Sequence, residues 1–208
     1  MIRKLSLLIS FCIISLFANA QTAISDPSSY LDAIRKANQD VHSIKCQYTL
    51  VHHVPLLESD QRQKGTFYYS DKAEGIALID ASANSKTVFS RTQFLSVENG
   101  QKIQLSADRS PAIAQMLSLI SSCLTGNFDV LSGRGNLVYD LTGEQEFRVT
   151  FVPTDRRMAK HFTRIVMTFS HANMTLSSLS LVSKNNESHT YSFASRTINI
   201  PIPPRIFE

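Results

Sequence analysis

The sequence contains no tryptophan, only three cysteines and only seven glycines. It has no glycine-rich phosphate loop, no dinucleotide-binding turn and no Gly-x-Ser-x-Gly nucleophile elbow. It also lacks the His-Glu-x-x-His motif and the paired-cysteine spacing that hold zinc. We therefore predict a protein that is not an enzyme, with no catalytic residues, no cofactor and no metal site.

The chain also has little excess charge, with a formal net charge of +4 at pH 7. Two of the positive charges, Arg3 and Lys4, lie in an N-terminal segment that we expect to be removed, which leaves a nearly neutral mature chain. Nucleic-acid binding requires clustered basic residues. We therefore predict no nucleic-acid partner.

The first twenty residues have the pattern of a secretory signal peptide. Arg3 and Lys4 precede an apolar run over residues 5–17, and Ala18-Asn19-Ala20 supplies the small residues of a cleavage site. An N-terminal membrane anchor is the alternative, but the run is too short to span a bilayer comfortably and polar residues follow it. We predict cleavage after Ala20 and a single mature domain over residues 21–208.

Two cysteines remain in the mature chain. Cys46 lies in an alternating apolar pattern, and Cys123 lies on the apolar side of a helical pattern. In an oxidising compartment the two can form a disulfide. Two separate buried thiols fit the same patterns at least as well. The sequence leaves both arrangements open.

The spacing of the apolar residues changes along the chain. They recur at helical spacing over residues 30–41, and again over 113–124 after Ser110 and Pro111, which suit a helix cap and a first turn. Elsewhere they alternate with polar residues, as in strands with one buried face. These short strands and polar turns predict an α+β protein with an antiparallel sheet. We expect strands at 43–51, 65–69, 76–80, 87–89, 93–97, 102–105, 137–141, 146–152, 162–169, 176–182, 189–193 and 198–202.

Aromatic side chains are frequent on the alternating positions, within a total of twelve phenylalanines and six tyrosines. A sheet of this size with only two helices must close on itself, pair with a second sheet or enclose an apolar cavity. We predict a ligand-binding hydrophobic cavity, although alternation alone does not decide which face is concave. The predicted lining residues are Phe67, Tyr69, Ile76, Leu78, Phe94, Phe147, Phe151, Ile165, Met167, Leu179 and Leu181.

The second helix has one apolar stripe and an opposite side of small, uncharged residues. We predict that it covers the cavity as a movable lid, because it can shift without breaking salt bridges and because a methionine adapts to differently shaped neighbours. A static core helix is the alternative. The predicted lid residues are Ile113, Met116, Leu117, Ile120 and Leu124.

The histidines suggest little chemistry. His52 and His53 end the first strand, and with Glu58 they could hold a metal ion. Adjacent residues of a strand point to opposite faces, so solvated histidines are the better interpretation. The basic turn over residues 155–161 is interpreted as a solvated loop, with a contact patch for an acidic partner as the alternative.

The order of these elements resembles the LolA-type periplasmic carriers of outer-membrane lipoproteins. The resemblance rests on Val41-His-Ser-Ile-Lys-Cys-Gln-Tyr-Thr49, on Gly65-Thr-Phe-Tyr-Tyr69 and on Phe147-Arg-Val-Thr-Phe-Val-Pro153. The helix after Ser110 stands where the family has its lid, and Ile200-Pro-Ile-Pro203 matches the apolar-proline tail. The motifs are short, but together they extend over nearly all of the mature chain.

This resemblance implies a strongly curved, incompletely closed antiparallel barrel with an N-terminal helix and a helical lid. It implies a monomeric periplasmic carrier that takes acyl chains of lipoproteins, or other lipids, from an inner-membrane ABC-type release complex to an outer-membrane acceptor. An envelope-stress sensor with the same fold is the alternative function.

The sequence also departs from the family pattern. The family commonly has Arg-Pro after its second strand and then Phe-x-Trp, whereas this chain has Ser70-Asp-Lys-Ala-Glu-Gly-Ile-Ala-Leu78. The arginine that ties the lid to the barrel is unmatched, and Lys72 is only a neighbouring cation. Ser90-Arg-Thr92 replaces the usual Asp-Gly turn. The chain therefore resembles a divergent member.

Overall fold

The structure is a computed structural model that describes residues 21–23, 26–106, 111–131, 133–142 and 146–208. The predicted signal peptide over residues 1–20, its cleavage site after Ala20 and the predicted helix cap Ser110 lie outside the described residues. The side chain of Ile113, a predicted lid residue, lies outside them as well.

A single sheet of twelve strands organises the chain, and all neighbouring strands pair antiparallel. The spatial order is β1-β8-β9-β10-β11-β12-β2-β3-β4-β5-β6-β7, so the last strand pairs with the second and joins two consecutive meanders. The strands are β1 (Gln21–Ala23), β2 (Ser43–His53), β3 (Gln61–Ser70), β4 (Gly75–Asp80), β5 (Ser85–Ser90), β6 (Gln93–Glu98), β7 (Gln101–Ser106), β8 (Gly135–Thr142), β9 (Glu146–Pro153), β10 (Arg164–Ser170), β11 (Leu176–Val182) and β12 (Ser188–Ile198).

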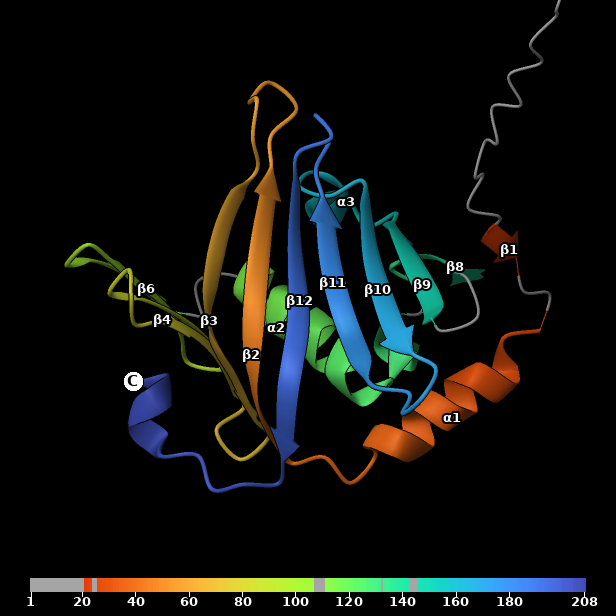
Figure 1. Cartoon of the computed structure of the whole chain (residues 1–208), viewed down its shortest axis with the longest axis horizontal. Helices are drawn as coiled ribbons and strands as arrows, with labels where there is room; N and C mark the ends of the chain where they lie inside the picture. The colour runs from red at the N-terminus through yellow and green to blue at the C-terminus, as the bar shows by residue number, and fades with distance from the viewer. Residues whose placement is uncertain (1–20, 24–25, 107–110, 132, 143–145) are drawn as a thin grey trace, which may run out of the picture.

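The sheet curves around a helix instead of closing into a barrel. Figure 1 shows α2 (Pro111–Thr125) behind the central strands β2, β12 and β11, with α1 (Ser28–Asn38) along one end of the sheet. Within the described ranges, β1 and β7 form the two edges and do not pair with each other. The predicted α+β fold, with a curved and incompletely closed antiparallel sheet, an N-terminal helix and a mid-chain helix, is confirmed.

The strand register determines which residues share the concave face. Tyr69 of β3 lies opposite Ile44 of β2 and Ile76 of β4. On the other half of the sheet, Met167 of β10 lies opposite Leu179 of β11. All five residues belong to one buried cluster, which also contains side chains of α1 and α2. The main core therefore lies between the concave face and these two helices.

Helix α1 is held to the sheet by stacking and by hydrogen bonds. The ring of Tyr30 stacks on that of Phe147 with centroids 4.8 Å apart, and Ile34 is fully buried. Asn38 is also fully buried. Its side-chain amide donates to the carbonyl oxygens of Ile34, at 2.7 Å, and Met174, at 2.9 Å. A buried amide needs such partners, so Asn38 secures the end of α1 to the turn after β10.

The C-terminal tail differs from the prediction. A separate strand over residues 198–202 is wrong, because β12 continues to Ile198 and the chain then forms the short 3-10 helix η3 (Pro204–Phe207). Phe207 packs with Ala77 and Val88 in a second, smaller buried cluster. The prolines of the tail cannot donate ladder hydrogen bonds. The tail therefore covers part of the sheet instead of extending it.

Both cysteines of the described chain are free and buried. Cys46 lies opposite Phe67 in the register of β2 and β3, and Cys123 lies on α2. Of the two arrangements that the sequence left open, separate thiols are therefore the one observed. Burial raises the pKa of each thiol to about 12.

We expect neither thiol to react with a thiol reagent in the folded protein at pH 8, because both lack access and a thiolate population. The measurement is reagent uptake by the mature protein with and without denaturant, with both thiols appearing only after unfolding. Fast uptake without denaturant, or a mass lower by two hydrogens, contradicts buried free thiols.

Candidate ligand-binding site

Helix α2 lies on the concave face with one half more deeply buried than the other. Leu119 and Cys123 are buried, as is Leu124, whereas Met116 and Ile120 are half-buried. Leu119 was not among the predicted lid residues, although it lies one helical turn from both Met116 and Cys123. Including Leu119 would have added a buried residue to the predicted apolar stripe.

The C-terminal end of α2 is secured by close packing. Gly126 has a positive φ of 72°, and its backbone N–H donates to the Ser122 carbonyl oxygen at 2.8 Å. A Cβ atom at this position would lie 2.4 Å from Cγ2 of Ile34 on α1. Only glycine combines this conformation with so close an approach. The close contact of Gly126 with Ile34 therefore holds the C-terminal end of α2 against α1.

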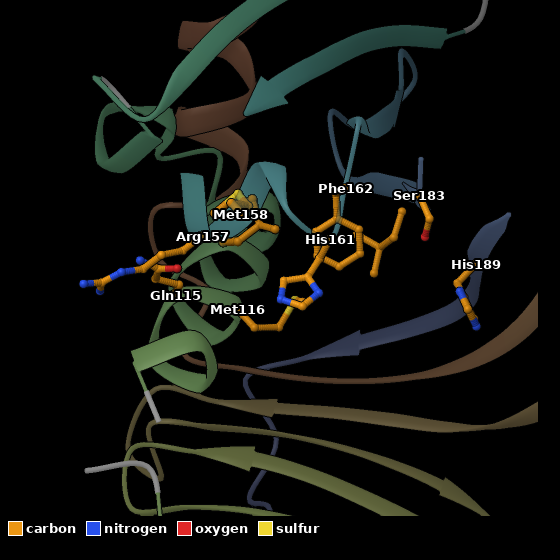
Figure 2. Close-up of a pocket in the computed structure, with 10 residues that line it drawn as sticks. Gln115, Met116, Arg157, Met158, His161, Phe162, Ser183 and His189 are labelled. Carbon is orange, nitrogen blue, oxygen red and sulfur yellow. The ribbon is translucent and has the colours of Figure 1, made fainter. Parts of the chain in front are cut away.

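The largest of the described cavities, about 470 Å³, lies beside α2. It opens between α2, strands β11 and β12, and the short helix α3 (Arg156–Ala159), which the sequence had suggested as a loop. Figure 2 shows His161 beside Met116, while the Arg157 guanidinium points away from the other labelled side chains. The lining residues are Gln115, Met116, Leu119, Arg157, Met158, His161, Phe162, Leu181, Ser183 and His189.

A smaller apolar cavity of about 90 Å³ lies between α2 and the sheet. It shares Met116 and Leu181 with the largest cavity. A third cavity, of about 170 Å³, shares Leu78, Phe89 and Tyr191 with this apolar one. The three cavities therefore adjoin one another along the concave face through these shared residues. A fourth, of about 360 Å³, lies between α2 and the β3–β4 turn.

The predicted site residues divide into three groups. Five line the 90 Å³ cavity, and Tyr69 lines the fourth cavity. Phe94 is half-buried and lies opposite Phe89, with ring centroids 5.0 Å apart. The remaining four are fully buried in the core, and the described lining of the four cavities does not include them. The five are Phe67, Ile76, Leu78, Leu179 and Leu181, and the four are Phe147, Phe151, Ile165 and Met167.

The lid residues divide in the same way. Met116 and Ile120 line the 90 Å³ cavity, while Leu117 lines the fourth cavity. Leu124 is buried in the main core.

Sequence reasoning missed three aromatic residues of the site. Phe89, Tyr191 and Phe193 line the 90 Å³ cavity together with the predicted residues. Tyr191 and Phe193 alternate along β12, and Tyr191 lies opposite Leu179. The alternation of Tyr191 and Phe193 indicated that they share a face of the sheet. Identifying that face as the cavity lining required knowledge of the strands that pair with β12. Burial raises the pKa of Tyr191, as expected for a phenol that lines an apolar space.

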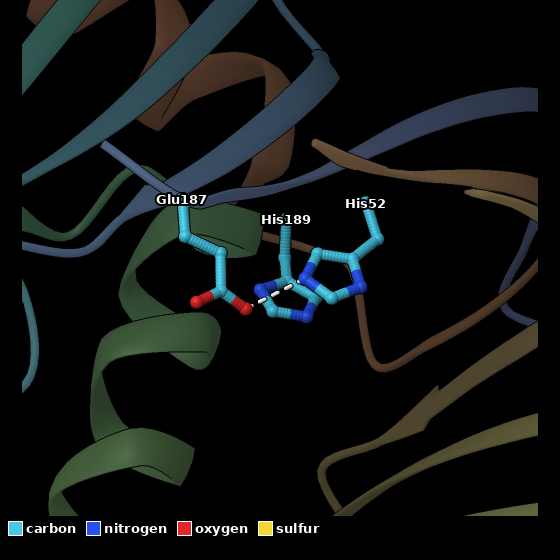
Figure 3. Close-up of side chains that lie close together, drawn as sticks. All are labelled: His52, Glu187 and His189. Atoms are coloured by element: carbon cyan, nitrogen blue, oxygen red, sulfur yellow. Dashed lines mark hydrogen bonds and ion pairs between the residues drawn. The ribbon is translucent and has the colours of Figure 1, made fainter. Parts of the chain in front are cut away.

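A polar cluster lies at one end of the concave face. His52 of β2 and His189 of β12 face each other in the register, with ring centroids 4.0 Å apart and nearly parallel. Nε2 of His52 lies 2.6 Å from Oε1 of Glu187, as Figure 3 shows. His53 points to the opposite face and pairs with Asp60 at 2.8 Å. The partners of the two histidines are therefore not the residue that the sequence suggested, Glu58.

The electrostatics of this cluster favour one charge state. The hydrogen bond with His52, followed by that from Asn185, holds the pKa of Glu187 below its usual range. Burial, together with the charge of His52, lowers the pKa of His189. At pH 7, Glu187 is therefore ionised and His189 is neutral.

Comparison with known proteins identifies similar folds. No family model and no curated protein matches the sequence. Among solved structures, a LolA superfamily protein from Nitrosomonas europaea is 10% identical, with a TM-score of 0.44 over 86% of this chain and 96% of its own. The Mycobacterium tuberculosis lipoprotein LppX is 13% identical, with a TM-score of 0.47 over 86% and 99%. A putative outer membrane lipoprotein-sorting protein domain from Vibrio parahaemolyticus is 8% identical, with a TM-score of 0.47 over 86% and 94%. The family that the sequence resembles is thus represented among these structures.

None of the helices in the described part of the chain has the length and apolar character needed to cross a bilayer.

Proposed function

We propose that this protein is a periplasmic carrier that binds acyl chains of lipoproteins, or of other lipids, between the concave face and α2. The observation that carries this proposal is the row of adjoining cavities along the concave face, one of which lies under a helix whose Met116 and Ile120 are only half-buried. The carrier delivers its cargo from the inner to the outer membrane. This activity needs no catalytic residue and no cofactor.

The cavity sizes require α2 to move when cargo binds. Small-molecule sites typically measure about 300–1,000 Å³, whereas the apolar cavity under α2 measures about 90 Å³. Lifting the half of α2 that carries Met116 and Ile120 joins this space to the neighbouring 470 Å³ cavity. Each large apolar side chain exposed to water opposes opening by about 1.5–3 kcal/mol, and each acyl methylene that is buried offsets about 0.8 kcal/mol. Exposing Met116 and Ile120 together costs about 3–6 kcal/mol, which about eight buried methylenes offset.

The predicted partners follow from this role. An inner-membrane ABC-type release complex hands over the acyl chains, and an outer-membrane acceptor removes them. The carrier acts as a monomer, since its own helix α2 covers the apolar concave face between transfers. Release requires an acceptor that buries the acyl chain better than the concave face does.

The absence of tryptophan provides a test of binding. We expect that a Tyr191→Trp variant, with its indole in the cavities, shows strong emission quenching by a brominated fatty acid, because the bromine atoms lie beside the ring when the chain is bound. A Val138→Trp variant is the matched control, because Val138 is 51% exposed on β8. Equal quenching of both variants contradicts binding on the concave face.

The natural cargo is tested by purifying the protein from its host envelope and extracting it with organic solvent. Recovery of lipoprotein or lipid supports a carrier. Recovery of a membrane regulator, with neither lipid nor lipoprotein, contradicts the carrier and supports the envelope-stress sensor.

A further inference from the structure

The cluster of His52, Glu187 and His189 has the composition and spacing of a metal site. One potential ligand atom from each residue can be chosen so that all three lie within 4.8 Å of one another. Two of the residues are fixed on neighbouring strands, and Glu187 directly precedes β12. The cluster lies at the rim of the 470 Å³ cavity, which His189 lines.

We propose that His52, Glu187 and His189 bind a divalent transition-metal ion of the zinc class, with its open coordination position toward the 470 Å³ cavity. Two imidazoles and one carboxylate form a common donor set for zinc, in which a water or another ligand completes a tetrahedron. Zinc–ligand bonds of about 2.0–2.2 Å place neighbouring ligand atoms roughly 3.5 Å apart. At present Nε2 of His52 and Oε1 of Glu187 are 2.6 Å apart, and the three ligand atoms all lie within 4.8 Å of one another, so side-chain rotation is needed to reach these separations.

The carboxylate of Glu187 is already oriented. Nδ2 of Asn185 donates to Oε2 of Glu187 at 3.3 Å, and the Glu187 backbone N–H donates to Oδ1 of Asn185 at 3.3 Å. The backbone N–H of Ser183 donates to the Glu187 carbonyl oxygen at 2.8 Å. Oε1 therefore remains directed at His52. Outer partners of this kind orient metal ligands and strengthen binding.

An ordinary ion pair accounts for His52 and Glu187 but not for His189. In the part of the chain that the structure describes, no side chain forms a hydrogen bond with the His189 ring, which instead stacks on His52. The carboxylate of Glu187 lies beside the pair, whereas Arg157 and His161 line the same cavity, with the Arg157 guanidinium pointing away from the other labelled side chains (Figure 2). A metal ion would use a ring nitrogen of His189, which the contact between His52 and Glu187 leaves without a hydrogen-bond partner among the described side chains.

Binding requires only soft motions. A metal ion lies near the plane of each imidazole that binds it, so the stacked rings must turn about their terminal torsions, which have broad minima. The ion also takes the place of the proton between His52 and Glu187, now 2.6 Å apart. The strand pairing of β2 with β12 fixes the backbone of both histidines during this change.

The test is titration of the protein, purified without a polyhistidine tag, with zinc chloride by calorimetry, and with cobalt(II) by visible absorption. We expect one ion per chain and a tetrahedral cobalt spectrum. His189→Ala and His52→Ala should each weaken zinc binding at least tenfold, and Glu187→Gln should weaken it by a smaller factor. His53→Ala is the matched control, because it removes a histidine one position along β2 that points to the opposite face and pairs with Asp60.

Three results overturn this inference: no zinc binding at tenfold excess, binding that His189→Ala leaves unchanged, or equal weakening by His53→Ala and His189→Ala. Circular dichroism of each variant shows that a loss of binding does not reflect unfolding. The metal site does not rest on the carrier function, because zinc binding by these three residues is measured without cargo, although His189 also lines the 470 Å³ cavity beside α2.

Discussion

Replacing Ile120 with glutamate should weaken fatty-acid binding at least tenfold while the sheet stays folded. Ile120 lines the apolar cavity opposite strand residues such as Phe67 and Leu179, but it is only half-buried. A carboxylate can therefore reach water when α2 is closed, whereas cargo would desolvate it. Loss of one large apolar contact removes about 1.5–3 kcal/mol, and each 1.4 kcal/mol changes the dissociation constant tenfold.

The measurement is titration with a fluorescent fatty acid, alongside thermal unfolding. Val138→Glu is the control, because it adds the same charge at an exposed apolar position of β8. If Ile120→Glu binds the fatty acid as the unmodified protein does, or if it simply unfolds, then α2 is not a lid and the alternative of a static core helix is supported.

Phe147→Ala should lower the free energy of unfolding by about 3–5 kcal/mol, the usual range for a buried phenylalanine. Phe147 is fully buried and stacks on Tyr30 of α1, with its ring centroid 6.2 Å from that of Tyr139 on β8. Its removal leaves a cavity that connects a helix and two strands, which cannot easily collapse. Chemical denaturation with a linear extrapolation measures the loss.

Val152→Ala is the matched control on the same strand, because Val152 is 37% exposed. We expect its effect to be below about 1 kcal/mol. Under conditions where Phe147→Ala remains folded, its fatty-acid affinity should be within about twofold of that of the unmodified protein, since Phe147 lies in the core and the described lining of the cavities does not include it. A small stability change with a large loss of binding would place Phe147 in the binding site instead.

The sequence alone was enough to predict which long segments form helices and which form strands, because both depend on the local spacing of apolar residues. Alternation predicted the strands of the meander, and a helical stripe predicted α2. Local spacing failed for short elements, which depend on distant partners. Strand β1 is three residues long and exists through its pairing with β8. Helix η3 forms where Phe207 meets the second buried cluster, a contact far from it in the chain.

The pattern of alternation determined which residues share a face, since side chains on a strand have a period of two. Only the tertiary structure decided that this face is concave and how deeply each member lies. Phe67 and Phe147 follow the same alternation, yet one lines a cavity under α2 and the other is sealed beneath α1. The difference arises from where the helices cross the sheet, which strand periodicity does not encode.

In the cluster of His52, Glu187 and His189, the sequence likewise determined one feature and the tertiary structure another. The sequence determined that His52 and His53 point to opposite faces, because they are adjacent on a strand. It did not determine that His52 faces Glu187 and His189, from which it is separated by about 135 residues. The pairing of β12 with β2 brings these distant residues together in space. The cluster forms only when the sheet is assembled, because its residues come from β2 and from β12 with the residue before it, which no local pattern connects.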